Sequence, residues 1–297
     1  MKILPITVVA FLMIFSSALM AQDEEAKAHF NAGIDAEKAG DNATAIKEYR
    51  AAIEKDATYS SPYFNLGVIL SNQKEYDAAV TNFTEFTKLD PSNLEGWKSL
   101  GIAATNAGNL TVGDKAFTEA LKLKPNDVEL VEAYAMLYYI NKAYTKAIPK
   151  LIEVTKLKST DKQIFYALGK SYQETGDNAK AIDAYESATK IDPKYHLAYF
   201  ELGNIYTAQE DYGLAIKRYK KAVEAEPDHY QSWYNLGSAC VAEQTAESIV
   251  DAYDAYKEFM SLTKGKSSSS VKKMRSTASG IMQQLKDYFD QAGIDYE

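Results

Sequence analysis

A 34-residue stretch decides the fold; residues 196–229 read HLAYFELGNIYTAQEDYGLAIKRYKKAVEAEPDH. Apolar side chains recur in it at intervals of three and four residues, which is the period of one face of an α-helix. The polar segment Gln209-Glu210-Asp211 interrupts the pattern near its middle, and Pro227 stands near its end. The stretch therefore predicts two helices of roughly 14 residues, joined by a short turn and stopped by the proline.

The same pattern recurs along the chain with a period of 34 residues. Its clearest marker is a glycine, at Gly33, Gly67, Gly101, Gly169, Gly203 and Gly237, with Ala135 in the one unit that lacks it. In most units a leucine precedes the glycine, an alanine follows it after 12 residues, and an aromatic residue follows that alanine after four. Self-similarity at this period indicates a solenoid of helical hairpins.

This pattern resembles the tetratricopeptide repeat, whose signature is W-x2-L-G-x2-Y, then A-x3-F, then P. The resemblance covers the units 26–59, 60–93, 94–127, 128–161, 162–195, 196–229 and 230–263, within a solenoid that we place at residues 22–263. It implies an all-α fold, a right-handed superhelix of stacked helix–turn–helix units. The small residues at the eighth and twentieth positions are expected where the two helices of a hairpin cross.

Some units depart from the pattern. Gly113 replaces the expected alanine and should weaken its helix by up to about 1 kcal/mol. Phe86 and Val154 also replace alanine, so we expect the helix crossing to open there. In the seventh unit, Ala252 and Tyr256 restore the pattern only if about three residues are inserted near residues 243–248.

The chain ends in a polar linker and one more amphipathic helix. Residues 264–270 are the predicted linker, and residues 271–297 are the predicted capping helix with its tail. One face of this helix is apolar, with Val271, Met274, Ala278, Met282, Leu285 and Phe289. A solenoid needs such a cap, because its last hairpin would otherwise leave an apolar face in water.

The first 21 residues have the layout of a secretory signal peptide. Lys2 precedes an apolar run over residues 3–15, and small residues follow up to Ala21. We expect cleavage after Ala21 or Ala18, and a bacterial protein that is exported to the periplasm or secreted, without stable membrane insertion. The alternative interpretation of this segment is an N-terminal membrane anchor.

Composition argues against several classes of function. The net charge of −8 gives no basic footprint for nucleic acid. One cysteine and three dispersed histidines give little material for a metal centre, and we expect no cofactor. The segment 108–115 nearly spells a phosphate-binding loop, but Asp114 separates its second glycine from Lys115. With no catalytic motif in view, we expect a protein that is not an enzyme.

The resemblance also implies a partner, because tetratricopeptide repeats commonly bind peptides or protein segments in the concave groove lined by their first helices. The groove positions are the second, fifth, sixth, ninth, twelfth and thirteenth of each unit. The fifth position holds Phe30, Phe64, Lys98, Glu132, Tyr166, Phe200 and Tyr234. We expect these aromatics to be dispensable for packing within a repeat. The candidate partner-binding residues are Phe64, Asn65, Tyr139, Tyr166, Phe200, Asn204, Tyr234 and Asn235.

Asn204 and Asn235 are 31 residues apart, the spacing of two asparagines in family members that grip a C-terminal carboxylate. Those members carry lysine at the fifth position, where this chain has Phe200, so a complete carboxylate clamp is not expected. Hydrogen bonding of the two asparagines to an extended peptide backbone remains the hypothesis. Two alternatives stay open: a structural protein that stacks through its end caps, and an accessory protein that binds a small ligand beside Tyr139 or Tyr166.

Overall fold

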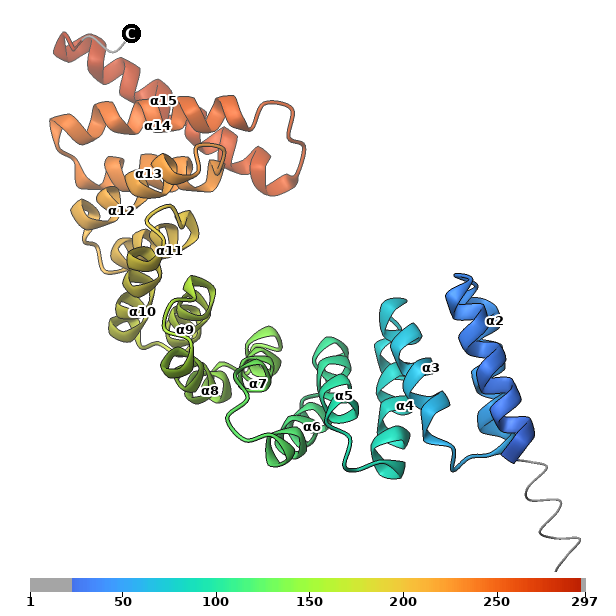
Figure 1. Ribbon diagram of the computed structural model, residues 1–297. Coiled ribbons are helices and arrows are strands. Elements are labelled where there is room, and N and C mark those ends of the chain that lie inside the picture. Colours follow the sequence, from blue (N-terminus) through green and yellow to red (C-terminus); the bar gives the residue numbers. More distant parts are fainter. Residues whose placement is uncertain (1–22, 295–297) are drawn as a thin grey trace, which may run out of the picture. The chain divides into compact units, whose positions relative to one another are not determined.

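The computed structural model describes residues 23–294, and the predicted signal peptide lies outside them. The chain divides into two compact units, an N-terminal unit that ends at Lys150 and a C-terminal unit that begins at Leu151. Each unit is built from consecutive helix pairs, and the described residues contain no strand (Figure 1). The fold is an all-α solenoid, as the 34-residue period predicts.

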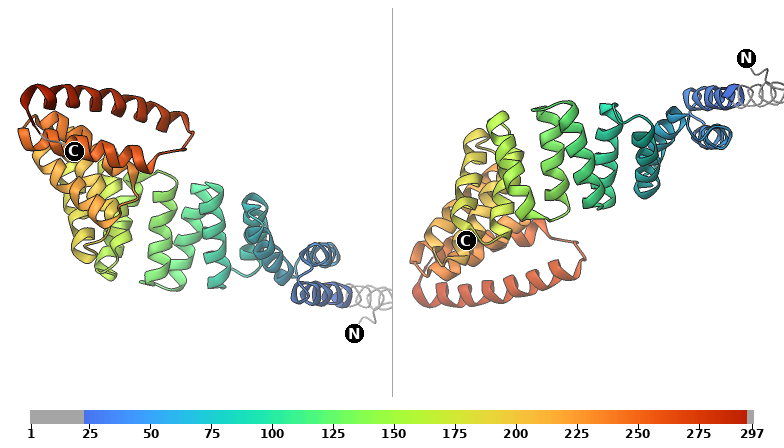
Figure 2. Two further views of the ribbon diagram at one scale, coloured as in Figure 1. Left: turned by 90° about the horizontal axis from the view of Figure 1, so that it is seen from above. Right: turned by 90° about the horizontal axis from the view of Figure 1, so that it is seen from below.

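The N-terminal unit begins with a helix over residues 23–38. It continues with α2 (Asn42–Lys55), α3 (Ser60–Asn72), α4 (Tyr76–Leu89), α5 (Leu94–Ala107), α6 (Leu110–Leu123) and α7 (Val128–Ile140), and α8 (Tyr144–Leu157) leads out of it. From α2 to α7, each helix packs on the next in chain order (Figure 2). A core of alanine, leucine and aromatic side chains runs through it.

The C-terminal unit consists of α9 (Lys162–Glu174), α10 (Asn178–Ile191), α11 (His196–Ala208), α12 (Tyr212–Ala225), α13 (Tyr230–Glu243), α14 (Ala246–Leu262) and α15 (Ser269–Ala292). The long helix α15 packs on α14 at the end of the array (Figure 2). Its buried side chains are Val271, Ala278, Leu285 and Phe289. The apolar face of α15 is therefore covered by its own unit.

The turn inside each hairpin contains one residue with a left-handed backbone. These residues follow the repeat period: Gly40, Lys74, Gly108, Lys142, Gly176, Glu210 and Gln244, with φ between 57° and 86°. In most hairpins the next residue is an aspartate or asparagine that caps the second helix; the Asp211 carboxylate, for example, accepts from the Leu214 N–H. Turn geometry and cap together place each second helix in the same register.

The repeated glycine makes room for an aromatic ring of its own hairpin. A Cβ added to Gly203 would lie 2.5 Å from Cε1 of Tyr219, and one added to Gly67 would lie 2.8 Å from Cε1 of Phe83. Tyr219 and Phe83 are almost completely buried. The glycine thus lets the second helix press its ring onto the backbone of the first. The small residue lies at the helix crossing, as the sequence pattern predicts, and the ring in contact with it belongs to the same hairpin.

The departures from the pattern are compensated by the following repeat. A Cβ on Gly113 would lie 2.7 Å from Cδ1 of Leu137, so the Leu137 side chain fills the space beside this glycine. The helix α6 continues through Gly113 without a break. The expected weakening of this helix by Gly113 stays a prediction, and the contact with Leu137 is a packing role that the sequence did not indicate. Phe86 likewise lies over Gly96, whose Cβ would come within 2.3 Å of Cε1 of the ring. Extra volume in one repeat is matched by a glycine in the next.

The insertion predicted in the seventh unit is confirmed by packing. The ring against Gly237 is Tyr256, which is 19 residues away (256 − 237), whereas Gly203 and Tyr219 are 16 apart (219 − 203). The helix that carries Tyr256, α14, has 17 residues, against 14 in α12. Tyr253, which occupies the unshifted ring position, packs instead on Phe289 of α15.

Two further observations concern residues 23–294. None of their helices combines the length and apolar character that a membrane crossing requires. Cys240 is completely buried, and burial raises the pKa of its thiol to about 12. The thiol therefore behaves as a small apolar side chain, as the sequence indicates.

Candidate functional site

The first helices of successive hairpins lie against one another, with contacts of α3 with α5, α5 with α7, and α11 with α13. We call the surface that they form within each unit the first-helix face. The fifth-position aromatics lie on it, but they are half-buried. Each packs on the ring of its own second helix: Phe64 on Phe83 at 5.7 Å, for example, and Phe200 on Tyr219 at 6.0 Å. The expectation that these aromatics are dispensable for packing is therefore wrong.

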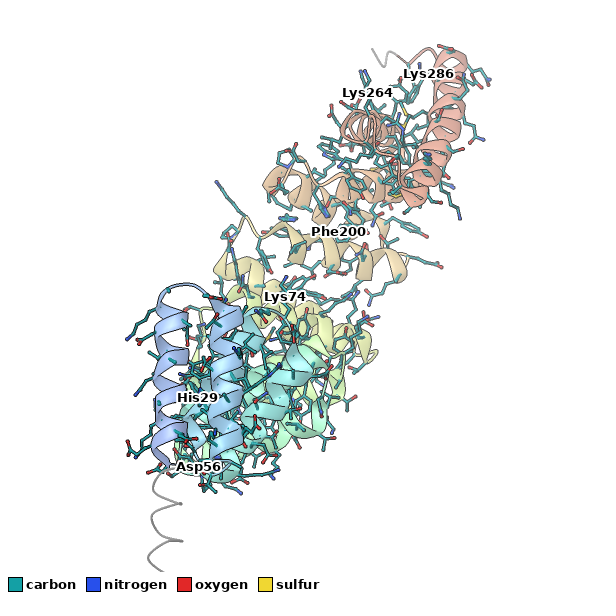
Figure 3. The ribbon with its side chains drawn as sticks, turned by 90° about the vertical axis from the view of Figure 1, so that its right-hand side faces the viewer. His29, Asp56, Lys74, Phe200, Lys264 and Lys286 are labelled. Atoms are coloured by element: carbon teal, nitrogen blue, oxygen red, sulfur yellow. The ribbon has the colours of Figure 1, made fainter. Side chains whose placement is uncertain are left out.

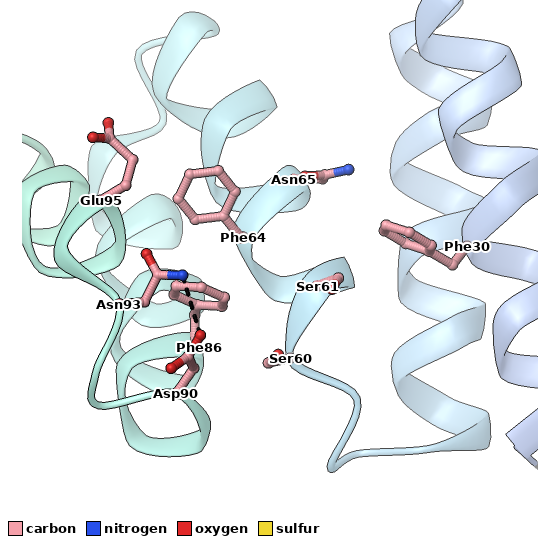
Figure 4. Close-up of a pocket in the computed structure, with 9 residues that line it drawn as sticks. All are labelled: Phe30, Ser60, Ser61, Phe64, Asn65, Phe86, Asp90, Asn93 and Glu95. Carbon is pink, nitrogen blue, oxygen red and sulfur yellow. Dashed lines mark hydrogen bonds between the residues drawn. The ribbon is translucent and has the colours of Figure 1, made fainter.

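A pocket of about 370 Å³ opens on the first-helix face of the N-terminal unit (Figure 4). We call it the Phe64 pocket; it is lined by Phe30, Ser60, Ser61, Phe64, Asn65, Phe86, Asp90, Asn93 and Glu95. The rings of Phe64 and Phe86 lie 5.0 Å apart, and Phe30 faces them from the helix over residues 23–38. Two residues predicted from the sequence, Phe64 and Asn65, thus meet in one concave site.

Hydrogen bonds hold Asn65 at the edge of this pocket. Its side-chain Nδ2 donates to the Tyr49 hydroxyl at 3.1 Å, and that hydroxyl donates to the Glu37 carboxylate at 2.7 Å. Burial and the bond to Glu37 raise the pKa of Tyr49 to about 12. Asn65 therefore has a structural role between two hairpins, besides its place beside the pocket.

The candidate residues of the C-terminal unit also pack into their hairpins. Tyr166 contacts Tyr185 at 5.5 Å and Tyr195 at 5.6 Å, and Tyr234 contacts Tyr256 at 5.7 Å. Phe200, on α11, is labelled in Figure 3. These rings form the floor of the first-helix face rather than projecting from it.

Asn204 and Asn235 are brought together, as their spacing predicts. Asn235 Nδ2 donates to Asn204 Oδ1 at 2.9 Å, and the Tyr219 hydroxyl donates to the same oxygen at 2.8 Å. Asn204 Nδ2 in turn donates to Glu201, whose carboxylate lies 3.6 Å from the Lys170 ammonium group. The two asparagines are thus held in a network of side chains that largely satisfy one another.

Two histidines that are distant in the sequence meet next to Phe200. The ring centroids of His196 and His229 lie 5.1 Å apart, and those of His229 and Phe200 also lie 5.1 Å apart, with the two ring planes nearly perpendicular. Burial and the His196 ring lower the pKa of His229. The three histidines are dispersed in the sequence, but the 33-residue separation of His196 and His229, one short of the repeat period, is the signal that identifies this pair.

Tyr139 belongs to α7 and packs on Tyr144 with ring centroids 6.2 Å apart. It is not among the residues that line the Phe64 pocket. A second polar cluster lies nearby in sequence, where the hydroxyls of Tyr134 and Tyr138 both donate to Asp114. This cluster joins α6 to α7, and the sequence alone did not indicate it.

Burial and the neighbouring polar groups shift the pKa of Asp114 in opposite directions. Burial alone would raise the pKa of this carboxyl, but the two tyrosine hydroxyls and the Lys146 and Lys150 ammonium groups together hold it below its usual value. The lysines lie over the rings, Lys150 at 4.9 Å from Tyr134 and Lys146 at 5.5 Å from Tyr138. The cluster is a charged link between neighbouring repeats. Within the described part of the chain, no group of three or more histidine, cysteine, aspartate or glutamate side chains could hold a metal ion.

Comparison with protein families matches the chain in several places. Residues 172–209 and 203–242 match the family described as TPR repeat, and residues 48–81 and 100–159 match two families described as tetratricopeptide repeat. None of the curated proteins matches the chain in sequence.

Several solved structures share the fold. The C-terminal part of a TPR repeat-containing protein from Cytophaga hutchinsonii is 18% identical, with a TM-score of 0.64 over 82% of this chain and 98% of that one. A tetratricopeptide repeat protein from Parabacteroides merdae is 14% identical, with a TM-score of 0.54 over 86% and 99%. YrrB, described as a TPR protein with an unusual peptide-binding site, is 21% identical, with a TM-score of 0.50 over 62% and 95%. At these identities the likeness is one of fold.

Proposed function

Because the chain belongs to the tetratricopeptide repeat family, we propose that it is a non-catalytic scaffold that binds a segment of another protein on its first-helix face. The observation that carries this proposal is the Phe64 pocket, in which three phenylalanine rings and several polar side chains converge on one open concavity. Pockets of this kind, with apolar walls and a few placed polar groups, are the usual form of binding sites.

The C-terminal unit supports the same proposal in a different way. Phe200, Tyr166 and Tyr234 offer half-buried rings, which lose little conformational entropy when a partner covers them. Asn235 uses one of its two N–H donors toward Asn204, so its amide keeps capacity for a partner's backbone. The description of YrrB as a peptide-binding TPR protein is consistent with use of the fold in this way.

We also propose that the protein acts in the bacterial envelope, as a periplasmic or secreted protein. The charged start, apolar run and small residues of the segment up to Ala21 support this location. N-terminal sequencing of the protein from fractionated cells tests it. We expect a chain that starts at Gln22 or after Ala18 in the exported fraction, and an uncleaved chain in the cytoplasm would contradict the proposal.

Photo-crosslinking in the native envelope tests the binding face. Benzoylphenylalanine is placed at Phe64, at Phe200 and, as a control, at Tyr288, which is 44% exposed on α15. We expect protein adducts from the first two positions and none from the third. Adducts from Tyr288 alone would contradict the proposal.

Sedimentation of the purified chain tests the alternative of a stacking structural protein. Particles that grow with concentration in the absence of any partner would favour self-assembly.

A further inference from the structure

We propose that the Phe64 pocket receives a basic side chain, arginine or lysine, from the bound protein segment. This inference rests on the proposed function, because it names the chemistry of a partner for the same face. It is carried by three features of the pocket: its aromatic walls, its unbalanced negative charge and its size.

The aromatic walls of the Phe64 pocket can attract a cation. Phe30, Phe64 and Phe86 come from three different helices, and their rings border one concavity (Figure 4). The face of a phenylalanine ring attracts a cation, and the methylene stem of arginine or lysine packs on apolar carbon. A basic side chain therefore satisfies both the rings and the apolar floor.

The charge of the pocket is negative and has no internal counter-charge. Asp90 and Glu95 line it, and none of its nine lining residues is basic. Neither carboxylate forms an ion pair with the described residues; the lysine one turn beyond Glu95, Lys98, lies 3.7 Å from Glu129 instead. Four other acidic groups at helix ends, Asp127, Asp161, Asp177 and Asp192, do have a lysine within 2.7 Å. Asp90 and Glu95 thus lack the cation that these four groups have.

The Asp90 carboxylate is held in place for such a contact. It accepts from the Ser92 hydroxyl at 2.9 Å and from Asn93 Nδ2 at 3.1 Å. The Asn93 side chain is itself held, because its Oδ1 accepts from the Gly96 N–H at 3.0 Å. A carboxylate that is already oriented loses less entropy when it binds a guanidinium or ammonium group.

Size and long-range charge favour the same occupant. A pocket of about 370 Å³ is at the small end of ligand sites, which suits one long side chain rather than a whole small molecule. The net charge of −8 steers basic segments toward the protein and disfavours acidic ones. A C-terminal carboxylate, the ligand considered for Asn204 and Asn235, would be repelled by Asp90 and Glu95.

The test is an NMR titration of the full chain with ¹³C-labelled phenylalanine. The probes are the N-acetyl amides of arginine, lysine, norleucine and glutamate, which share the backbone and differ in charge. We expect saturable shifts of Phe30, Phe64 and Phe86 with arginine and lysine, and roughly threefold to tenfold weaker binding of norleucine. Norleucine binding as well as arginine, or no saturable shift of these rings with arginine, would overturn the inference.

Matched variants locate the charge. Glu95→Gln and Asp90→Asn should each weaken arginine binding roughly threefold or more. The control Glu75→Gln makes the same charge change at an exposed residue outside the pocket and should leave binding unchanged. If the pocket variants bind arginine as tightly as the wild type, the inference fails. Envelope crosslinking from Phe64 in the Glu95→Gln variant then shows whether the proposed function fails together with this inference. Adducts that persist in that variant would show that the first-helix face still binds a partner without the basic contact.

Discussion

The first-helix faces of the two units share one repeat register, but their polar side chains differ in how far they bond one another. In the C-terminal unit, Lys170, Glu201, Asn204 and Asn235 bind one another, so charge and hydrogen bonds are largely satisfied within the face. In the N-terminal unit, Asn65 is satisfied by Tyr49, whereas the carboxylates of the Phe64 pocket face no cation. The repeat therefore determines where a side chain lies, and its neighbours decide whether it is available to a partner.

A second comparison explains the asparagines. Tyr49 and Tyr219 are each followed by asparagine 16 residues later, at Asn65 and Asn235, whereas Tyr185 is followed at that spacing by Glu201 and donates from its hydroxyl to Gln173. Where the ring of the second helix is Phe83, the same position is Ser99. A buried hydroxyl needs a partner and a phenyl ring does not. Asn65 thus serves a buried hydroxyl, and Asn235 meets Tyr219 at the shared Asn204 oxygen, whatever else the two asparagines bind.

The largest expected effect breaks the feature that both units share. Gly67→Ala and Gly203→Ala should each destabilise the protein by about 3 kcal/mol, because the new Cβ would overlap a buried ring. Gly280→Ala is the matched control, since nothing lies within 4 Å of its Cβ position, and it should stabilise α15 by about 1 kcal/mol. Urea unfolding measures all three. A destabilised Gly280→Ala, or a neutral change at either repeat glycine, would contradict the packing described here.

The next effect separates structural from partner-binding asparagines. Asn204→Ala removes the oxygen that accepts from both Tyr219 and Asn235, and should cost about 1–2 kcal/mol of unfolding free energy without any partner. In a Tyr219→Phe background the cost should be smaller, because one donor has been removed. Chemical denaturation of the four proteins in the cycle measures the coupling. Equal cost in both backgrounds would show that the network does not couple these residues.

Acid denaturation tests the contribution of the Asp114 carboxylate to the stability of the N-terminal unit. The pKa of Asp114 is lower in the folded protein than in the unfolded chain, so its stabilising effect is complete above about pH 4 and is lost as pH falls through the folded pKa. Asp114→Asn should therefore lower stability at pH 7 and flatten the pH dependence below about pH 4. Asp77→Asn, an exposed change on α4, is the control. An unchanged acid limb in Asp114→Asn would refute the role of the cluster.

The smallest expected effect concerns the turns. Lys74 has φ of 64° at the position where other hairpins have glycine. Lys74→Gly should stabilise the protein by a few tenths to about 1 kcal/mol, because glycine adopts this backbone without strain. Gly176→Ala, with φ of 86° and open space around it, should show the opposite sign. Thermal unfolding of the two variants measures both effects. A change of stability with the same sign in both would show that turn strain does not matter here.

The period of the sequence was sufficient to predict helices, hairpins and the close helix crossing at the repeated glycine, because these follow from positions that recur, whereas the ring that each glycine contacts was not predicted. The period also predicted the shift of Tyr256 against Gly237. It could not predict the compensation of Gly113 by Leu137, since that depends on how two neighbouring repeats fit together. A one-dimensional pattern assigns residues to a face, but it does not say which side chains reach each other.

The candidate site shows the same limit. Phe64, Asn65 and the Asn204–Asn235 pair could be identified from register alone. Asp90 could not, because it lies just beyond the end of α4, outside the positions that the resemblance assigned to the groove. Glu95 holds the second position of its unit, which is one of those positions, but register could not show that it lies beside Phe64 and Phe86. Nor could register show the packing of Phe200 on Tyr219 and His229, which depends on side-chain torsions.

Hydroxyl-radical footprinting of the full chain with and without its captured partner tests the central claim most directly. Oxidation of the aromatic side chains, measured by mass spectrometry, reports their exposure residue by residue. We expect the partner to protect Phe30, Phe64 and Phe200, which are half-buried on the first-helix face, and to leave the exposed Tyr288 of α15 unchanged. Protection of Tyr288 with no change at the three phenylalanines would place the partner on another surface and contradict the account.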